Sequence, residues 1–257
     1  MRIDLNCDMG EGFGCYSLGS DEDVMPLVSS ANVACGFHAS DPGTMHRTVR
    51  LAKRNGVAVG AHPSFPDLVG FGRRHLAASP DEVRDDVLFQ VGALWAFCRA
   101  EGVPLRHVKA HGALYNAAAK DLKTALAIAE AVRAVDPALW LVCLSGSALV
   151  EAARQTGLRH VEEVFADRAY ARDGTLVPRT TPGSVIHDAV RVEERVVKMV
   201  REGAVQALDG GEVALRVGTI CVHGDTPGAV SLVRAIRGRL EREGIEVAAF
   251  SKAEGAT

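Results

Sequence analysis

Short apolar segments alternate with polar loops and amphipathic segments along the whole chain. The apolar segments are rich in Val, Ala, Ile and Cys and are bounded by Gly, Pro or charged residues, a pattern typical of buried strands. In the opening stretch Ile3 and Leu5 share one strand face, and the strand delivers Asn6, Asp8 and Glu11 into a glycine-rich turn. We expect strands in the opening stretch 2–14 and at 29–35, 57–61, 103–109, 139–144, 161–166, 217–222 and 246–250.

Between these strands, apolar residues recur at helical spacing and the starts of helices are marked. Ser79 is followed by Pro80 and Glu82, which predicts an N-cap, a proline at the first helical position and a capping box. The helix that follows carries an apolar stripe of Val83, Val87, Val91, Leu94, Trp95 and Cys98, which we expect to be core. We expect the other helices between 41 and 56 and at 122–135, 145–153, 184–208 and 226–240.

Strands that alternate with helices form parallel sheets. The length of 257 residues and the number of strand–helix units favour closure of the sheet into a (β/α) barrel, with an open doubly wound sheet as the alternative. We find no internal repeat and no linker, so we expect a single domain over residues 1–257.

Composition narrows the class of protein. A hydrophobic fraction of 47% with 24% charged residues is typical of soluble enzymes. The formal net charge of −3 gives no excess of positive charge that would indicate binding to nucleic acid or to an anionic membrane. No apolar run approaches the ~20 residues of a membrane span, and the N-terminus resembles no secretory signal, so we expect a cytoplasmic protein. The six cysteines form no Cys-x-x-Cys pair, and we expect all of them to be reduced.

Polar and titratable residues follow several of the expected strands. A single histidine at the end of a strand more often caps a helix than binds a ligand, but in a closed barrel all these groups would meet at one mouth. Burying many titratable groups together costs desolvation that a purely structural role would not justify. The set consists of Asp8, Glu11, His38, Asp41, His62, Lys109, His111, Asp167, Arg168, His223 and Asp225.

Two chemistries fit this set. Asp8, His38 and His62 on neighbouring strands would suit a divalent metal ion that activates water. Alternatively, carboxylates and histidines act as general acid and base, while Lys109 and Arg168 hold an anionic group. The sequence contains no phosphate-binding Gly-x-x-x-x-Gly-Lys-Ser/Thr loop, no dinucleotide fingerprint and no Gly-x-Ser-x-Gly nucleophile elbow.

Several motifs, in order from residue 4 to about residue 227, resemble those of the LamB/YcsF family. They are 4–14 (DLNCDMGEGFG), 32–38 (NVACGFH), 60–64 (GAHPS), 70–74 (GFGRR), 111–116 (HGALYN), 165–170 (FADRAY), 173–179 (DGTLVPR) and 221–227 (CVHGDTP). One departure is Ala110, where the family usually has proline between the lysine and the histidine.

The resemblance implies an irregular, TIM-like (β/α) barrel of about seven parallel strands, related to polysaccharide deacetylase barrels. It also implies an ATP-dependent reaction that opens the lactam ring of 5-oxo-L-proline to L-glutamate, with release of ADP and phosphate. Two further subunits, B and C, would be required. Because the sequence has no phosphate-binding loop, we expect that this chain alone neither binds ATP tightly nor turns over.

We assign roles to the strand-end residues on this basis. Asp8 or Glu11 would be the general base, or would bind a metal ion with His38 and His62. The remaining catalytic residues would be Lys109, His111 and His223, with either histidine protonating the ring nitrogen, and the substrate-binding residues would be Asn6, Asp167, Arg168 and Arg179. The alternatives are a stand-alone metal-dependent deacetylase or amidase, and a non-catalytic subunit that binds substrate.

Overall fold

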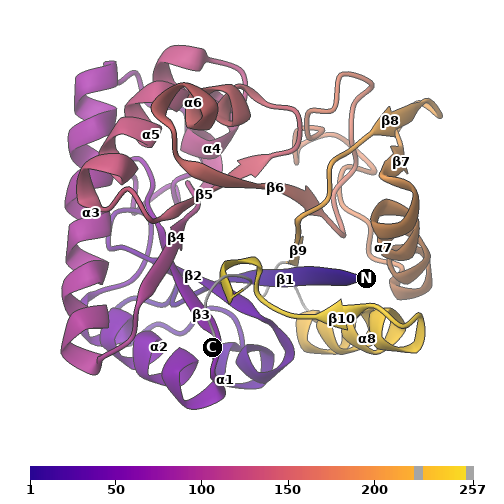
Figure 1. Cartoon of the computed structure of the whole chain (residues 1–257), viewed down its shortest axis with the longest axis horizontal. Helices are drawn as coiled ribbons and strands as arrows, with labels where there is room; N and C mark the ends of the chain where they lie inside the picture. The colour runs from indigo at the N-terminus through magenta and orange to yellow at the C-terminus, as the bar shows by residue number, and fades with distance from the viewer. Residues whose placement is uncertain (223–227, 253–257) are drawn as a thin grey trace.

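The computed structural model describes residues 1–222 and 228–252. Seven parallel strands close into a barrel, because β1 pairs with β2 on one side and with β9 on the other (Figure 1). An eighth strand, β10, adds to the end of β1, and β7 and β8 form a separate antiparallel hairpin. The strands are β1 Arg2–Met9, β2 Ser30–Ala34, β3 Ala58–His62, β4 Leu105–Val108, β5 Trp140–Leu144, β6 Arg159–Phe165, β7 Ala204–Gln206, β8 Glu212–Ala214, β9 Thr219–Val222 and β10 Glu246–Val247.

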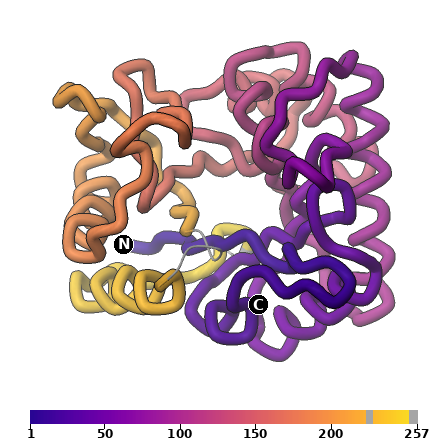
Figure 2. Tube along the Cα trace, turned by 180° about the vertical axis from the view of Figure 1, so that it is seen from behind, coloured from indigo at the N-terminus to yellow at the C-terminus, as the bar shows by residue number. Residues whose placement is uncertain are grey.

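Helices surround the barrel. In the view from behind, the last two long helices lie side by side and away from the other long helices (Figure 2), and α7 packs against α8. On the other side α2 packs on α3, α3 on α5 and α5 on α6. The helices are α1 Asp21–Val24, α2 Pro42–Asn55, α3 Pro80–Glu101, α4 Gly112–Ala118, α5 Leu122–Val135, α6 Ala148–Thr156, α7 Ala189–Glu202 and α8 Ala229–Arg242, with 3₁₀ turns at Met25–Leu27 and Phe250–Lys252.

The interior of the barrel is polar. On β1, Ile3, Leu5 and Cys7 are buried in the hydrophobic core, whereas Asp4 and Asn6 form hydrogen bonds to polar side chains of other strands. Such a network is stable only where every member has a partner. Its members come from five strands: Asp4, Asn6 and Asp8; Ser30 and Asn32; His107; Glu163; and Thr219 and Cys221, with Lys109 directly after β4.

The structure corrects some expectations. The expected helix 184–208 is wrong at both ends, since α7 begins after the N-cap Asp188, ends before Gly203 and is followed by the β7–β8 hairpin. Trp95 is not core, because it is 41% exposed and contacts the Arg99 guanidinium. The expected last strand, 246–250, is limited to β10.

Other expectations are confirmed. All six cysteines are free, and all but Cys15 are buried. Among the described residues, none of the helices combines the length and apolar character that crossing a membrane requires.

Candidate active site

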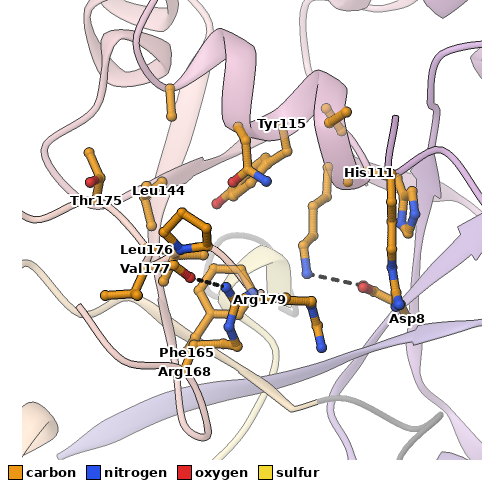
Figure 3. Close-up of a pocket in the computed structure, with 18 of the residues that line it drawn as sticks. Asp8, His111, Tyr115, Leu144, Phe165, Arg168, Thr175, Leu176, Val177 and Arg179 are labelled. Atoms are coloured by element: carbon orange, nitrogen blue, oxygen red, sulfur yellow. Dashed lines mark hydrogen bonds and ion pairs between the residues drawn. The ribbon is translucent and has the colours of Figure 1, made fainter. Parts of the chain in front are cut away.

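A cavity of about 550 Å³ opens at the carboxyl ends of the strands (Figure 3). Its lining combines acids, histidines and basic residues with apolar side chains, and a barrel enzyme places its active site at this end. The polar and aromatic side chains discussed next come from the last residues of β1, β3 and β6, from the loops after β1, β3, β4 and β6, and from helix α4. They are Asp8, Glu11, His62, Arg73, Lys109, His111, Tyr115, Phe165, Arg168 and Arg179.

Lys109 is a buried, paired cation. Its Nζ lies 3.0 Å from Asp8 Oδ1 and 2.9 Å from Glu163 Oε1, and it also contacts Asn6 Oδ1 at 3.3 Å and Cys221 Sγ at 3.1 Å. Burial alone would lower the pKa of Lys109, but the negative charges of Asp8 and its other neighbours raise that pKa well above its usual value. Lys109 is therefore a fixed ammonium group and cannot act as a base.

Asp8 is held from two directions. Its Oδ1 accepts hydrogen bonds from Lys109 and from Asn32 Nδ2, the latter at 2.8 Å, and its Oδ2 lies 3.2 Å from His62 Nε2. The Asp8 side chain is 13% exposed and lines the cavity. A substrate in the cavity would therefore contact a carboxylate whose orientation is fixed by Lys109, Asn32 and His62.

Glu11, His38, His62 and His111 form a compact cluster beside Asp8. One nitrogen or oxygen donor atom from each residue lies within 4.8 Å of those of the other three, so these residues could together hold a metal ion. Burial, with the neighbouring His62, lowers the pKa of His111 to about 3, and burial and nearby histidines lower the pKa of His38 well below its usual value. Both rings are therefore neutral at ordinary pH, which is the form that binds metal ions.

Basic residues form another part of the cavity wall. Arg168 is buried and donates from Nη2 to the carbonyl of Val177 at 2.7 Å, so it anchors the loop that follows β6 (Figure 3). Burial, with the nearby Arg179, lowers the pKa of Arg168 to about 10, which still leaves it charged at neutral pH. Arg73 lies over the Phe71 ring, 5.0 Å from its centroid, and lines the cavity, as does the exposed Arg179. These charges suit an anionic ligand.

Most of the site residues expected from the sequence meet at this cavity: Asp8, Glu11, His62, Lys109, His111, Arg168 and Arg179 all line it. Asn6, His38 and Asp167 are buried but do not belong to the described residues that line it. Asn6 supports Lys109 from inside the barrel, and Asp41 caps helix α2 by accepting from the backbone N–H groups of Gly43 and Thr44. His223 and Asp225 lie outside the residues that the structure describes.

Several residues of the site were not predicted from the sequence. Glu163 pairs with Lys109 and accepts a hydrogen bond from the Tyr115 hydroxyl at 2.7 Å, and Asn32 orients Asp8. Two adjacent glutamates in the middle of the expected strand 161–166, Glu162 and Glu163, were a usable signal for Glu163. Arg73 lay in the 70–74 motif, but no strand end marked it.

Comparison with known proteins gives consistent results. Residues 3–255 match the LamB/YcsF family. A relative from Thermus thermophilus, named as the A subunit of 5-oxoprolinase, is 58% identical over 250 residues, which is 97% of this chain and 100% of the relative. A protein of the same name from Pyrococcus furiosus is 55% identical over 247 residues, covering 96% of this chain and 97% of the relative.

A solved structure shares the fold. The crystal structure of a lactam utilization protein from Thermus thermophilus superposes with a TM-score of 0.93 at 57% sequence identity, over 97% of this chain and 100% of that chain. The match spans the barrel and the loops that build the cavity.

Proposed function

The chain belongs to the LamB/YcsF family, and on that premise we propose that it is the A subunit of an ATP-dependent 5-oxoprolinase. This enzyme opens the lactam ring of 5-oxo-L-proline to L-glutamate while ATP is hydrolysed. The observation that carries the proposal is the fixed Asp8 carboxylate, which shares one cavity with histidines and with several cationic side chains. We place this chain in the cytoplasm, where ATP is available to the reaction.

The cavity suits the charges of the reactants. 5-Oxo-L-proline carries one carboxylate, and an activating phosphoryl group would add further negative charge. Arg73, Lys120, Arg168 and Arg179 line the cavity and can bind such oxygens, with arginine well suited to planar or tetrahedral anions. Lys109 is paired with Asp8 and Glu163, so its part is to orient Asp8. This differs from the direct substrate contact expected from the sequence.

Ring opening needs a proton removed from water and a proton supplied to the departing ring nitrogen. Asp8 is the best placed general base, because its carboxylate is oriented by Lys109 and Asn32 and still lines the cavity. Glu11 is the alternative base. His111 lines the same cavity, but its ring is neutral and its Nε2–H faces the Phe71 carbonyl, so Asp8 is better placed to return the proton that it takes from water to the leaving nitrogen. From the sequence, we also propose His223 as a residue that protonates the leaving nitrogen.

The ring nitrogen of a lactam is a poor leaving group, so ATP would phosphorylate the carbonyl oxygen, with release of ADP. Attack of one water on that carbon and cleavage of the C–N bond would give an acyl phosphate, which a second water would hydrolyse to L-glutamate and phosphate. The sequence has no phosphate-binding loop of the P-loop type. We therefore assign tight ATP binding to the complex with subunits B and C, and lactam binding and ring opening to this chain.

An omission assay tests this assignment. Formation of L-glutamate and of ADP from 5-oxo-L-proline and ATP is measured with this chain plus subunits B and C, and with each component left out in turn. We expect coupled product formation only in the complete mixture. Lactam-dependent glutamate formation without this chain would contradict the proposal.

The same assay separates the two alternatives. A stand-alone amidase would release product from this chain without ATP or partners. A non-catalytic binding subunit would keep turnover in the complete mixture when Asp8 or Glu11 is replaced, although substrate affinity or assembly would fall. Either result would replace the proposed catalytic role.

A further inference from the structure

The rings of His62 and His111 face each other through His62 Nε2 and His111 Nδ1. His62 Nδ1 lies 2.7 Å from the carbonyl oxygen of Lys109, and His111 Nε2 lies 2.9 Å from that of Phe71. A carbonyl oxygen only accepts, so each of these nitrogens carries the ring proton. In the neutral rings the other two nitrogens, His62 Nε2 and His111 Nδ1, are then lone-pair acceptors, yet they are only 3.0 Å apart. Two acceptors at this distance repel each other unless a cation or a shared proton lies between them.

A carboxylate completes the arrangement. Glu11 Oε1 lies 3.6 Å from His111 Nδ1 and 3.3 Å from His38 Nε2. Ligands bound about 2.0–2.1 Å from a zinc ion at tetrahedral angles lie about 3.3–3.4 Å from each other. The contacts of 3.0 Å and 3.6 Å bracket that spacing. The carbonyl groups that bind the far nitrogens of His62 and His111 are the usual outer partners of metal-bound histidines.

The fourth member of the cluster has a different position. Glu11, His62 and His111 line the cavity, whereas His38 is fully buried and is not among the described residues that line it. The His38 ring stacks parallel to the His111 ring, with centroids 3.8 Å apart and planes 4° apart. Its in-plane lone pairs therefore run alongside those of His111 and do not converge with them. His38 is placed to donate a hydrogen bond to Glu11.

We propose that Glu11, His62 and His111 bind one divalent transition-metal ion, with the open coordination position facing the cavity and His38 orienting Glu11. Two imidazoles and one carboxylate suit zinc, cobalt or iron better than magnesium or calcium. This set replaces His38 by His111, and Asp8 by Glu11, in the metal site expected from the sequence. Asp8 Oδ2 lies 3.2 Å from His62 Nε2, beside the proposed ion and paired with Lys109.

Such an ion would polarise a carbonyl oxygen or lower the pKa of a bound water at the position where the lactam is expected. That use of the metal ion rests on the proposed function, but metal binding itself does not. Binding can therefore be measured on this chain without its partners and without turnover.

The test is zinc titration of the purified, chelator-treated full chain by calorimetry, together with the visible spectrum of the cobalt-loaded chain. We expect one zinc ion per chain with a Kd below about 1 µM. Glu11→Gln, His62→Asn and His111→Asn should each weaken binding by more than about 100-fold, and His38→Asn by about 10–100-fold, as for other outer partners. The cobalt spectrum should change in the three ligand variants.

The matched control is His75→Asn, which removes an exposed histidine of the neighbouring loop and should bind zinc as the wild type does. Thermal unfolding of each metal-free variant shows whether it is folded. If the chain binds one zinc ion but the complete mixture with subunits B and C does not open the lactam, the metal site is supported and the proposed function is contradicted. The metal site is contradicted if the folded wild-type chain does not bind zinc, or if all three ligand variants bind zinc as tightly as the wild type. Neither result would contradict the proposed function.

Discussion

At the scale of single residues, Asp4 shows how a buried carboxylate is tolerated. Its Oδ1 accepts from the hydroxyls of Ser29 and Ser30, each at 2.7 Å, and its Oδ2 accepts from Thr219. Burial nevertheless raises the pKa of Asp4 to about 6, because the hydroxyls only partly replace water. The folded state therefore binds the Asp4 proton more tightly than the unfolded chain does.

This raised pKa predicts a pH-dependent loss of stability. Between about pH 4 and pH 6 the folded state holds a proton that the unfolded state has lost, so the contribution of Asp4 to stability falls as pH rises through this window. The full difference is about 3 kcal/mol. In urea unfolding, the stability of Asp4→Asn relative to wild type should rise by up to this amount between pH 4 and pH 7. A stability difference that does not change with pH would contradict the argument.

The sequence predicted those cavity-lining residues that lie at or directly after the ends of strands, such as Asp8, His62 and Lys109. It did not predict the pairings among them, because a strand-end position fixes which edge of the sheet a residue lies at but not its partner. Lys109 was expected to bind substrate, yet Glu163 and Asp8 neutralise it. Glu163 lies on β6, far from Lys109 along the chain, and only the closed barrel brings the two together.

At the scale of elements, the sequence predicted helix ends correctly where the capping interactions involve neighbouring residues in the chain. Ser79 caps helix α3 with the full capping box, and α2 ends at Gly56 in the left-handed conformation. The end of α7 was missed because Ala204 and Val205, the first residues of β7, extend its series of apolar residues past Gly203. Gly203, with a φ of 63°, was the local signal that the helix stops.

Replacing glycine by alanine should have opposite effects on stability at Gly60 of β3 and at Gly92 of α3. A Cβ on Gly60 of β3 would overlap the His107 ring inside the barrel, so Gly60→Ala should lower stability by about 1–3 kcal/mol. Gly92 lies within helix α3 with no heavy atom within 4 Å of an added Cβ in the described part of the chain. Gly92→Ala should therefore raise stability by about 0.5–1 kcal/mol. Urea unfolding of both variants tests this, and a neutral Gly60→Ala would show that His107 moves freely.

At the scale of the whole molecule, barrel closure makes a site from residues spread along the chain. The register that pairs Asp4 with Thr219 and Cys7 with Val222 joins the first strand to the last barrel strand. Alternation of strands and helices predicted a parallel sheet, and the family resemblance implied seven strands, which the structure confirms. Apolar pattern alone could not give that number, because β7, β8 and β10 are also strands but lie outside the closed ring.

The most direct test of the central claim is the rate of L-glutamate formation by the complex assembled with Asp8→Asn. Because Asp8 is proposed to take the proton from water, we expect kcat to fall by about 10²- to 10⁴-fold with little change in the thermal unfolding midpoint. Asp85→Asn is the matched control, since that carboxylate is 72% exposed on helix α3 and should leave the rate unchanged. A folded Asp8→Asn complex that releases glutamate at the wild-type rate would contradict the account.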